Sequence, residues 1–261
     1  MRRLLDAGIL RTASLTTLSF EAWPQAREEE LIDFAMDVAG LCGIVTKQHT
    51  GLPVIALLDT DGAPIKRVVS NVVESDFRKD SILRVLHFDE HGLPQVFRQC
   101  FEEYVKLRKS PLWYRMPSYL AVIEDSPYLE QKIATLMPAI ELLLRSSLVE
   151  AGACSADAAE RGFLLDLLGM ARRLLAWDIP KHYTIRESYR VLRNAVAHGL
   201  RLPSGAEDTR REFDKWHLFL LRRVLIRLGY DGHVRCPHRG YVSSSAVNDF
   251  SAEFNSFNLS G

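Results

Sequence analysis

Apolar residues recur at helical spacing through most of this chain. From Pro94 onward a period of about 3.6 residues is maintained until Gly229. The pattern predicts helices over residues 94–105, 118–123, 126–149, 156–176, 184–198 and 204–228. In the helix predicted over 156–176, the inward face includes Phe163 and Leu174. We therefore expect a helical bundle to occupy the second and larger part of the chain.

Local signals mark where these helices begin and end. Ser126 followed by Pro127 is typical of a helix start, with serine as the N-cap and proline in the first turn. Residues 184–187 and 204–207 each read as a capping box, in which the first and fourth side chains satisfy free backbone N–H groups. Gly152 separates the helices on either side of it, and Pro138 is expected to bend its helix.

The first part of the chain has a different pattern. A helix with an acidic first turn is predicted over residues 25–41. Strands are predicted over 53–59 and 65–69, on either side of the turn dipeptide Asp61-Gly62. Residues 14–20 and 82–88 are further strand candidates. The predicted organisation is a small α+β region with an antiparallel hairpin (1–92), a helical domain (93–240) and a tail (241–261) that is poorly ordered or, alternatively, a docking segment.

Charge changes this picture only locally. The chain has 33 basic and 33 acidic residues, so no overall electrostatic argument points to nucleic acid or to a membrane. Between Lys181 and Arg239, however, thirteen Lys and Arg residues stand against six Asp and Glu residues. A polyanion is therefore expected to be drawn to this basic part of the chain.

Other composition features exclude several classes of protein. The four cysteines are scattered, which fits a reducing cytoplasm, and Cys236-Pro237-His238 has no second ligand pair at zinc spacing. We therefore expect neither a metal site nor a cofactor. No apolar run approaches the roughly 20 residues of a membrane span. The sequence predicts a cytoplasmic protein without a membrane partner.

The residues with the most chemistry are Arg193, Asn194 and His198, followed by Gly199, at the end of a predicted helix. Arginine binds phosphate, and histidine titrates near neutral pH, as proton transfer requires. On one ideal helix Arg193 and His198 lie about 140° apart, so a single copy brings them together poorly. A simpler alternative is that Arg193 is a surface residue and His198 only a helix cap.

The pattern around these residues resembles the HEPN domains (higher eukaryotes and prokaryotes nucleotide-binding). The R-x-x-x-x-H motif from Arg193 to His198 matches, as does a helix containing Tyr128-Leu-Glu-Gln131 and Ala139-Ile-Glu141. Among HEPN domains, the chain resembles in particular the ApeA-like branch, which is found in bacterial anti-phage defence. The resemblance implies a HEPN-type helical bundle over the C-terminal part of the chain.

That resemblance also implies an activity. HEPN ribonucleases cleave RNA without metal, at a composite site formed by the R-x-x-x-x-H motifs of two protomers. His198 would then act as acid or base, Arg193 would hold the scissile phosphate, and Asn194 would orient it. The basic residues around the motif, Arg186, Arg190 and Arg201, would bind RNA, with Glu141 and Tyr189 supporting the site from behind.

The resemblance further implies a biological setting. The expected role is that of a nuclease toxin or abortive-infection protein, acting as a homodimer and controlled by an antitoxin or a phage-derived trigger. An alternative is a catalytically inactive HEPN module that binds RNA, a nucleotide or a partner protein. Retention of arginine, asparagine and histidine in the motif favours the ribonuclease.

Overall fold

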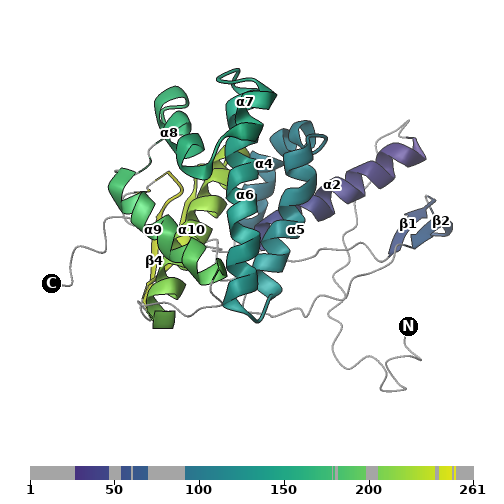
Figure 1. Ribbon diagram of the computed structural model, residues 1–261. Helices are drawn as coiled ribbons and strands as arrows, with labels where there is room; N and C mark the ends of the chain where they lie inside the picture. The colour runs from purple at the N-terminus through teal and green to yellow at the C-terminus, as the bar shows by residue number, and fades with distance from the viewer. Residues whose placement is uncertain are drawn as a thin grey trace.

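The computed structural model describes residues 27–46, 54–59, 61–69, 92–177, 179, 182–197, 205–238, 241–248 and 250. Within these ranges the chain is mainly helical and contains two separate antiparallel hairpins (Figure 1). The predicted mainly helical fold with an antiparallel hairpin before the helices is thus confirmed. The strands predicted over 14–20 and 82–88 lie outside the described residues.

The elements follow one another in a simple order. The first part contains α2 (Glu28–Thr46), β1 (Val54–Leu58) and β2 (Pro64–Val69). The bundle contains α4 (Gly92–Leu107), α5 (Pro111–Asp125), α6 (Leu129–Glu150), α7 (Ala156–Arg161), α8 (Leu164–Leu174), α9 (His182–Ala197) and α10 (Gly205–Arg227). The chain then forms β3 (His233–His238) and β4 (Tyr241–Ala246).

Helix α6 lies at the centre of the bundle and contacts α5, α7, α8, α9 and α10 (Figure 1). Its apolar positions repeat every three or four residues, and they are buried as the sequence pattern predicts. Leu136 and Leu143, for example, are completely inaccessible to solvent. Truncating a leucine in such an environment typically costs about 2–5 kcal/mol, so α6 contributes much of the stability of the bundle.

Helix α2 packs on α4 and α5 at one side of this bundle (Figure 1). Its residues Leu41 and Ile44 are buried in the same hydrophobic core as the helices after residue 92. The hairpin formed by β1 and β2 is next to α2, to which Lys66 is joined by an ion pair with Glu28. No break in the core therefore separates α2 from the bundle.

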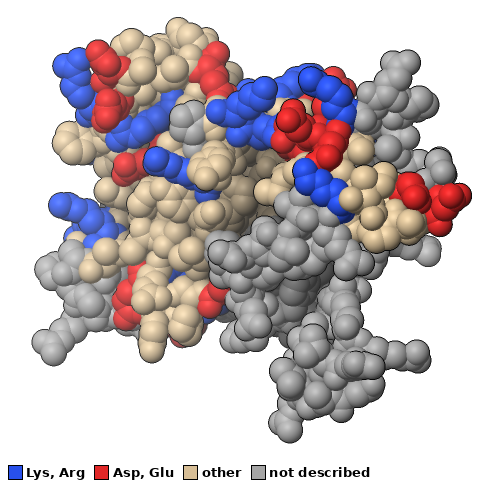
Figure 2. All heavy atoms as spheres, turned by 90° about the vertical axis from the view of Figure 1, so that its right-hand side faces the viewer, with Lys and Arg blue, Asp and Glu red and all other residues tan. Residues whose placement is uncertain are grey.

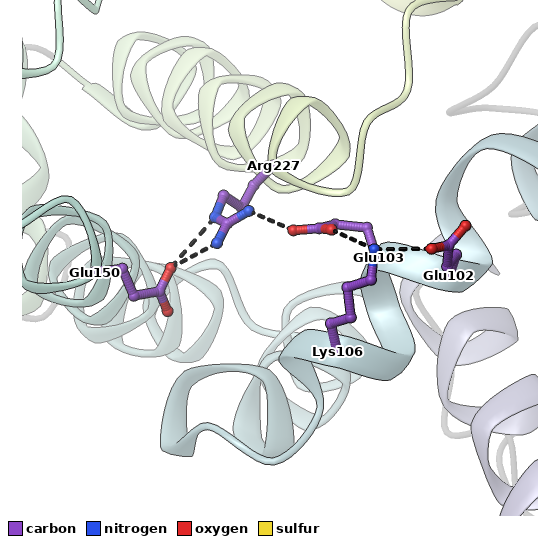
Figure 3. Close-up of polar contacts among 5 residues, drawn as sticks. All are labelled: Glu102, Glu103, Lys106, Glu150 and Arg227. Atoms are coloured by element: carbon purple, nitrogen blue, oxygen red, sulfur yellow. Dashed lines mark hydrogen bonds and ion pairs between the residues drawn. The ribbon is translucent and has the colours of Figure 1, made fainter.

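An ion-pair cluster joins α4, α6 and α10 (Figure 3). Arg227 Nη1 donates to Glu103 Oε1 at 2.9 Å, and Nη2 donates to Glu150 Oε2 at 2.9 Å. Burial lowers the pKa of Arg227, but the two carboxylates outweigh this effect and raise it overall. In the same cluster Lys106 pairs with Glu102 at 2.9 Å. Glu103 and Glu150 therefore hold α4, α6 and α10 together through Arg227.

The helix predicted over 156–176 is two helices, so this prediction was wrong. Gly162 and Phe163 have extended backbone between α7 and α8, and the Phe163 side chain is 79% exposed instead of buried. Leu174, also predicted to face inward, is 53% exposed. The cause of the break lies in α6, because Arg145 donates to the carbonyl oxygens of Ala159 and Gly162 and so satisfies the end of α7.

Two predicted helix starts were also wrong. Helix α6 begins at Leu129 with Tyr128 as N-cap, whereas Ser126 and Pro127 belong to the turn after α5. Helix α9 begins at His182, which places Thr184 inside the helix instead of at its cap. The start of α10 at Gly205 agrees with the third prediction, although Ser204 itself lies outside the described residues.

The prediction of poor order in the tail was wrong for residues 241–248 and 250. Strands β3 and β4 pair from His233 with Ala246 to His238 with Tyr241. Val247 and Phe250 are each 2% exposed and belong to the hydrophobic core. Residues 251–261 lie outside the described ranges.

Two arginines of α10 anchor this C-terminal segment. Arg222 donates to the carbonyl oxygen of Ala246, and the Arg223 guanidinium lies 3.9 Å from the ring centre of Phe250. Arg223 also lies 4.4 Å from the ring centre of Trp177, which precedes α9. Cation–π contacts of this kind contribute about 2 kcal/mol when they are desolvated. The segment after α10 is thus part of the folded core.

Candidate functional site

The candidate site is built on helix α9, which is strongly amphipathic. Ile185, Ser188 and Leu192 face inward and are at most 5% exposed. Arg186 and Arg190 are exposed on the opposite side. The helical repeat thus separates a buried face from a basic outer face.

Three arginines follow one another along the outer face of α9. Arg186, Arg190 and Arg193 are spaced i, i+4 and i+7, which places them within about 60° of one another around the helix axis. They extend over about 10 Å of helix. We call this set the arginine face. Such a row of cations suits a ligand with repeated negative charges.

Acidic neighbours neutralise only part of the arginine face. Arg190 forms an ion pair with Glu187, and both side chains are more than half exposed. Within the described ranges Arg193 has no ion-pair partner. The side of the molecule that carries α2 and the first hairpin differs, because basic and acidic side chains there lie next to one another (Figure 2). The arginine face is therefore the better candidate for binding a polyanion.

The structure places only part of the predicted catalytic motif. Arg193 is exposed, Asn194 is half-buried, and α9 ends at Ala197, one residue before the predicted end of the helix. His198 and Arg201 lie outside the described residues. The relation of His198 to Arg193 thus stays a prediction, while the described part brings Arg193 together with Arg186 and Arg190.

A buried polar network lies beneath the arginine face. Trp216 Nε1 donates to Ser188 Oγ at 2.7 Å, and the Ser188 hydroxyl donates to a carboxylate oxygen of Glu212. The other oxygen of Glu212 accepts from Lys215 Nζ at 2.7 Å. Trp216 is completely buried and Lys215 is 7% exposed.

This network determines how α9 is rotated on α10. A buried indole N–H or carboxylate without a partner costs free energy, so rotating α9 about its axis would break several bonds at once. The arginine face is therefore held outward. Sequence reasoning missed the network because its members come from two helices. The only local signal was a serine in the apolar stripe of α9.

Asp214 is a second residue that sequence reasoning missed. Burial raises the pKa of its carboxyl group, although the Arg210 side chain, 3.2 Å away, and Lys132 both lower it. The neighbouring charges of Lys132 and Glu124 place it where α5 ends and α6 begins. The Asp214 side chain is 40% exposed and pairs with Arg210 one turn earlier on α10, so it serves as an ion-pair partner within that helix.

The two predicted supporting residues have separate surroundings. Glu141 is half-buried and lies 3.6 Å from Arg145 Nη2, the arginine that binds the end of α7. The carboxylate therefore has the partner that its position near an apolar face requires. Tyr189 is half-buried and packs against the hydrophobic core beside the arginine face. No contact between described residues joins Glu141 to Arg193.

Three further findings bear on the candidate site. Among the described residues, no three His, Cys, Asp or Glu side chains lie close enough together to bind a metal ion. None of the helices in the described ranges combines the length and apolar character needed to cross a membrane. Searches against protein-family models, curated proteins and solved structures find no match to this chain.

Proposed function

We propose that this chain is a metal-independent endoribonuclease of the HEPN type. The observation that carries the proposal is the arginine face of α9, the helix whose last residue, Ala197, directly precedes His198 in the sequence. The proposal combines this basic surface with the resemblance of residues 193–198 to the R-x-x-x-x-H motif. The class of substrate is RNA, which has both a charged backbone and a 2′-hydroxyl group that can act as nucleophile.

The arginine face would bind the RNA backbone. Arg186, Arg190 and Arg193 offer cations along about 10 Å of helix, enough to contact successive phosphates of one strand. Each contact releases counterions, so binding should weaken as salt is added. Arg201, four residues after the helix ends, would extend this surface.

The chemical step would be an internal transfer at phosphorus. His198 takes the proton of the ribose 2′-hydroxyl, and the 2′-oxygen attacks the adjacent phosphorus. The bond from phosphorus to the 5′-oxygen breaks, and that oxygen leaves with the proton that His198 had taken from the 2′-hydroxyl. The products are a 2′,3′-cyclic phosphate and a free 5′-hydroxyl, and no water is consumed.

Arg193 would stabilise the negative charge that develops on the phosphoryl oxygens, and Asn194 would orient the phosphate. Mutational studies of comparable groups assign general acid–base catalysis about 10²–10⁴-fold and a positioned charge donor about 10²–10³-fold. Because residues five positions apart would point about 140° apart if one helix carried both, the proposed site takes its two halves from two protomers. The homodimer is therefore part of the proposal.

The proposed setting is anti-phage defence by abortive infection, or a toxin system, in the cytoplasm. A nuclease that attacks the RNA of its own cell needs control, which an antitoxin or a phage-derived trigger would supply. The side of the chain formed by α2 and the first hairpin, away from α9, is the part that such a regulator could reach without blocking RNA (Figure 1).

RNA cleavage in the presence of EDTA tests the proposal. The wild-type chain should cleave and His198→Ala should not, whereas His233→Ala, which removes an exposed histidine in β3, should retain activity. Mapping of the RNA ends should find cyclic phosphate and 5′-hydroxyl groups. Equal cleavage by wild type and His198→Ala would refute the proposal. Salt-sensitive RNA binding without cleavage would support the inactive HEPN module instead.

A further inference from the structure

The outer face of α8 has an unusual combination of exposed groups. Phe163, at the N-cap of α8, is 79% exposed, and Leu174, its last residue, is 53% exposed. Met170 lies between them and is half-buried. The opposite face of α8 is already buried against α6. This helix therefore exposes an apolar side chain at each of its two ends.

Charged residues accompany the apolar groups on this outer face. Asp166 lies in the first turn and Arg173 in the last turn, and both are exposed. Since they are seven residues apart, they lie on the same side of the helix, next to Met170. Within the described ranges neither of them has an ion-pair partner.

The sequence of this face is complementary to itself in the antiparallel direction. If a second α8 lies antiparallel across the first, Asp166 meets Arg173 of the other copy at both ends. Phe163 meets Leu174 of the other copy in the same arrangement. The midpoints of both pairs fall between residues 168 and 170, so one two-fold axis satisfies them together. Met170 lies beside this centre, on the same side of the helix as Asp166, Arg173 and Leu174.

We propose that a second copy of this chain covers the outer face of α8 as an antiparallel helix pair around Met170. The four apolar side chains at the two ends leave water, and two ion pairs between the copies determine the direction. Antiparallel helix dipoles also favour this arrangement.

The proposed contact uses residues of α8, whereas the proposed composite RNA site uses residues of α9 and His198. The inference therefore depends on the surface of α8 alone and makes no use of RNA cleavage.

The α8 pair is expected to be weak. Eleven residues of helix are about 16 Å long, so α8 alone covers less than the roughly 800 Å² per partner that stable complexes bury. The association should therefore depend on concentration.

Sedimentation velocity over about a hundredfold range of protein concentration tests the proposal. Phe163→Ser should raise the dissociation constant about tenfold or more, because two phenylalanine contacts are lost in each dimer. Tyr114→Ser is the matched control, since Tyr114 is an aromatic residue on α5 that is 81% exposed. Its association should equal that of the wild type. Both variants should keep the melting temperature of the dilute protein, because neither side chain packs in the core.

Charge reversal tests the direction of the pair. Asp166→Arg and Arg173→Asp should each weaken association, because like charges then meet twice in each dimer. The double variant should regain most of the wild-type association, since opposite charges face each other again. A wild-type chain that remains monomeric at every concentration would overturn the proposal. So would a mass that none of the α8 variants changes, and in that case the composite RNA site could still stand.

Discussion

The substitution Ser188→Ala removes the hydroxyl group that links α9 to α10. In the variant the completely buried Trp216 N–H loses its acceptor, and Glu212 loses one donor while keeping Lys215. An unsatisfied buried donor costs about 1–3 kcal/mol, and a hydrogen bond to a charged group contributes about 1.5–3 kcal/mol. Because these terms overlap, we expect the free energy of unfolding to fall by about 2–4 kcal/mol.

Urea unfolding with linear extrapolation measures this change. Ser147→Ala in α6 is the matched control, because Ser147 is also a buried helical serine but its hydroxyl has no hydrogen-bond partner among the described residues. That substitution should be neutral or stabilise the protein by about 1 kcal/mol, since it removes an unpaired polar group. Combining Ser188→Ala with Trp216→Phe should cost less than the sum of the single changes.

The outcome that would refute this reasoning is specific. If Ser188→Ala costs no more than Ser147→Ala, the network does not stabilise the junction of α9 and α10. If the double variant shows simple additivity, Ser188 and Trp216 do not act through a common hydrogen bond. In either case the rotation of α9, and with it the position of the arginine face, would need another explanation.

Three further predictions concern other parts of the chain. Phe250→Ala should lower the free energy of unfolding by about 3–5 kcal/mol, because it empties a core site and removes the ring over Arg223. Arg186→Ala should reduce the salt dependence of RNA binding by about 0.7 in the logarithmic slope, the value for one phosphate contact on a single strand. Burial raises the pKa of Asp37 above its ordinary 3.8, although Arg108 lowers it, so the folded chain holds this proton more tightly than the unfolded chain. The contribution of Asp37 to stability should therefore decrease as the pH rises through 3.8, and Asp37→Asn should remove that decrease.

Each of these predictions has a contrary result. Phe250→Ala with wild-type stability in urea would mean that the C-terminal segment does not complete the core. If fluorescence anisotropy finds the same salt dependence of RNA binding for Arg186→Ala and the wild type, Arg186 does not contact an RNA phosphate. Identical pH profiles of unfolding for wild type and Asp37→Asn would show that the Asp37 pKa is the same in the folded and unfolded chains.

The long helices could be predicted from the sequence because their signal is local. In α6 the buried residues repeat at helical spacing from Ile133 to Leu148, and no distant contact is needed to recognise them. The break between α7 and α8 could not be predicted in this way. It depends on Arg145, an arginine of a preceding helix that binds the carbonyl groups at the end of α7.

The C-terminal hairpin was missed for a related reason. Residues 242–246 are mostly serine and have no apolar alternation, so they look like a tail. The segment is held by Arg222 and Arg223, which sequence reasoning counted only as positive charge. A charged residue that binds a carbonyl group or an aromatic ring stabilises a core as an aliphatic residue would, but it leaves no hydrophobic pattern.

The position of the arginine face on α9 could be predicted from the sequence, but the hydrogen-bond network that holds this face outward could not. Arg186, Arg190 and Arg193 were identified from the basic part of the chain, and the helical repeat places them on one face. The network that orients this face joins residues 188 and 216 across two helices, so spacing along the chain contains no sign of it.

The anchoring of residues 246–250 by α10 has a consequence for synthesis. Arg222 and Arg223 are buried among apolar residues only when Ala246 and Phe250 lie against them. Before residues 246–250 have been synthesised, Arg222 lacks the Ala246 carbonyl and Arg223 lacks the Phe250 ring. The bundle can therefore reach its final stability only after these residues have left the ribosome, so chains truncated before residue 246 should be substrates for proteolytic quality control.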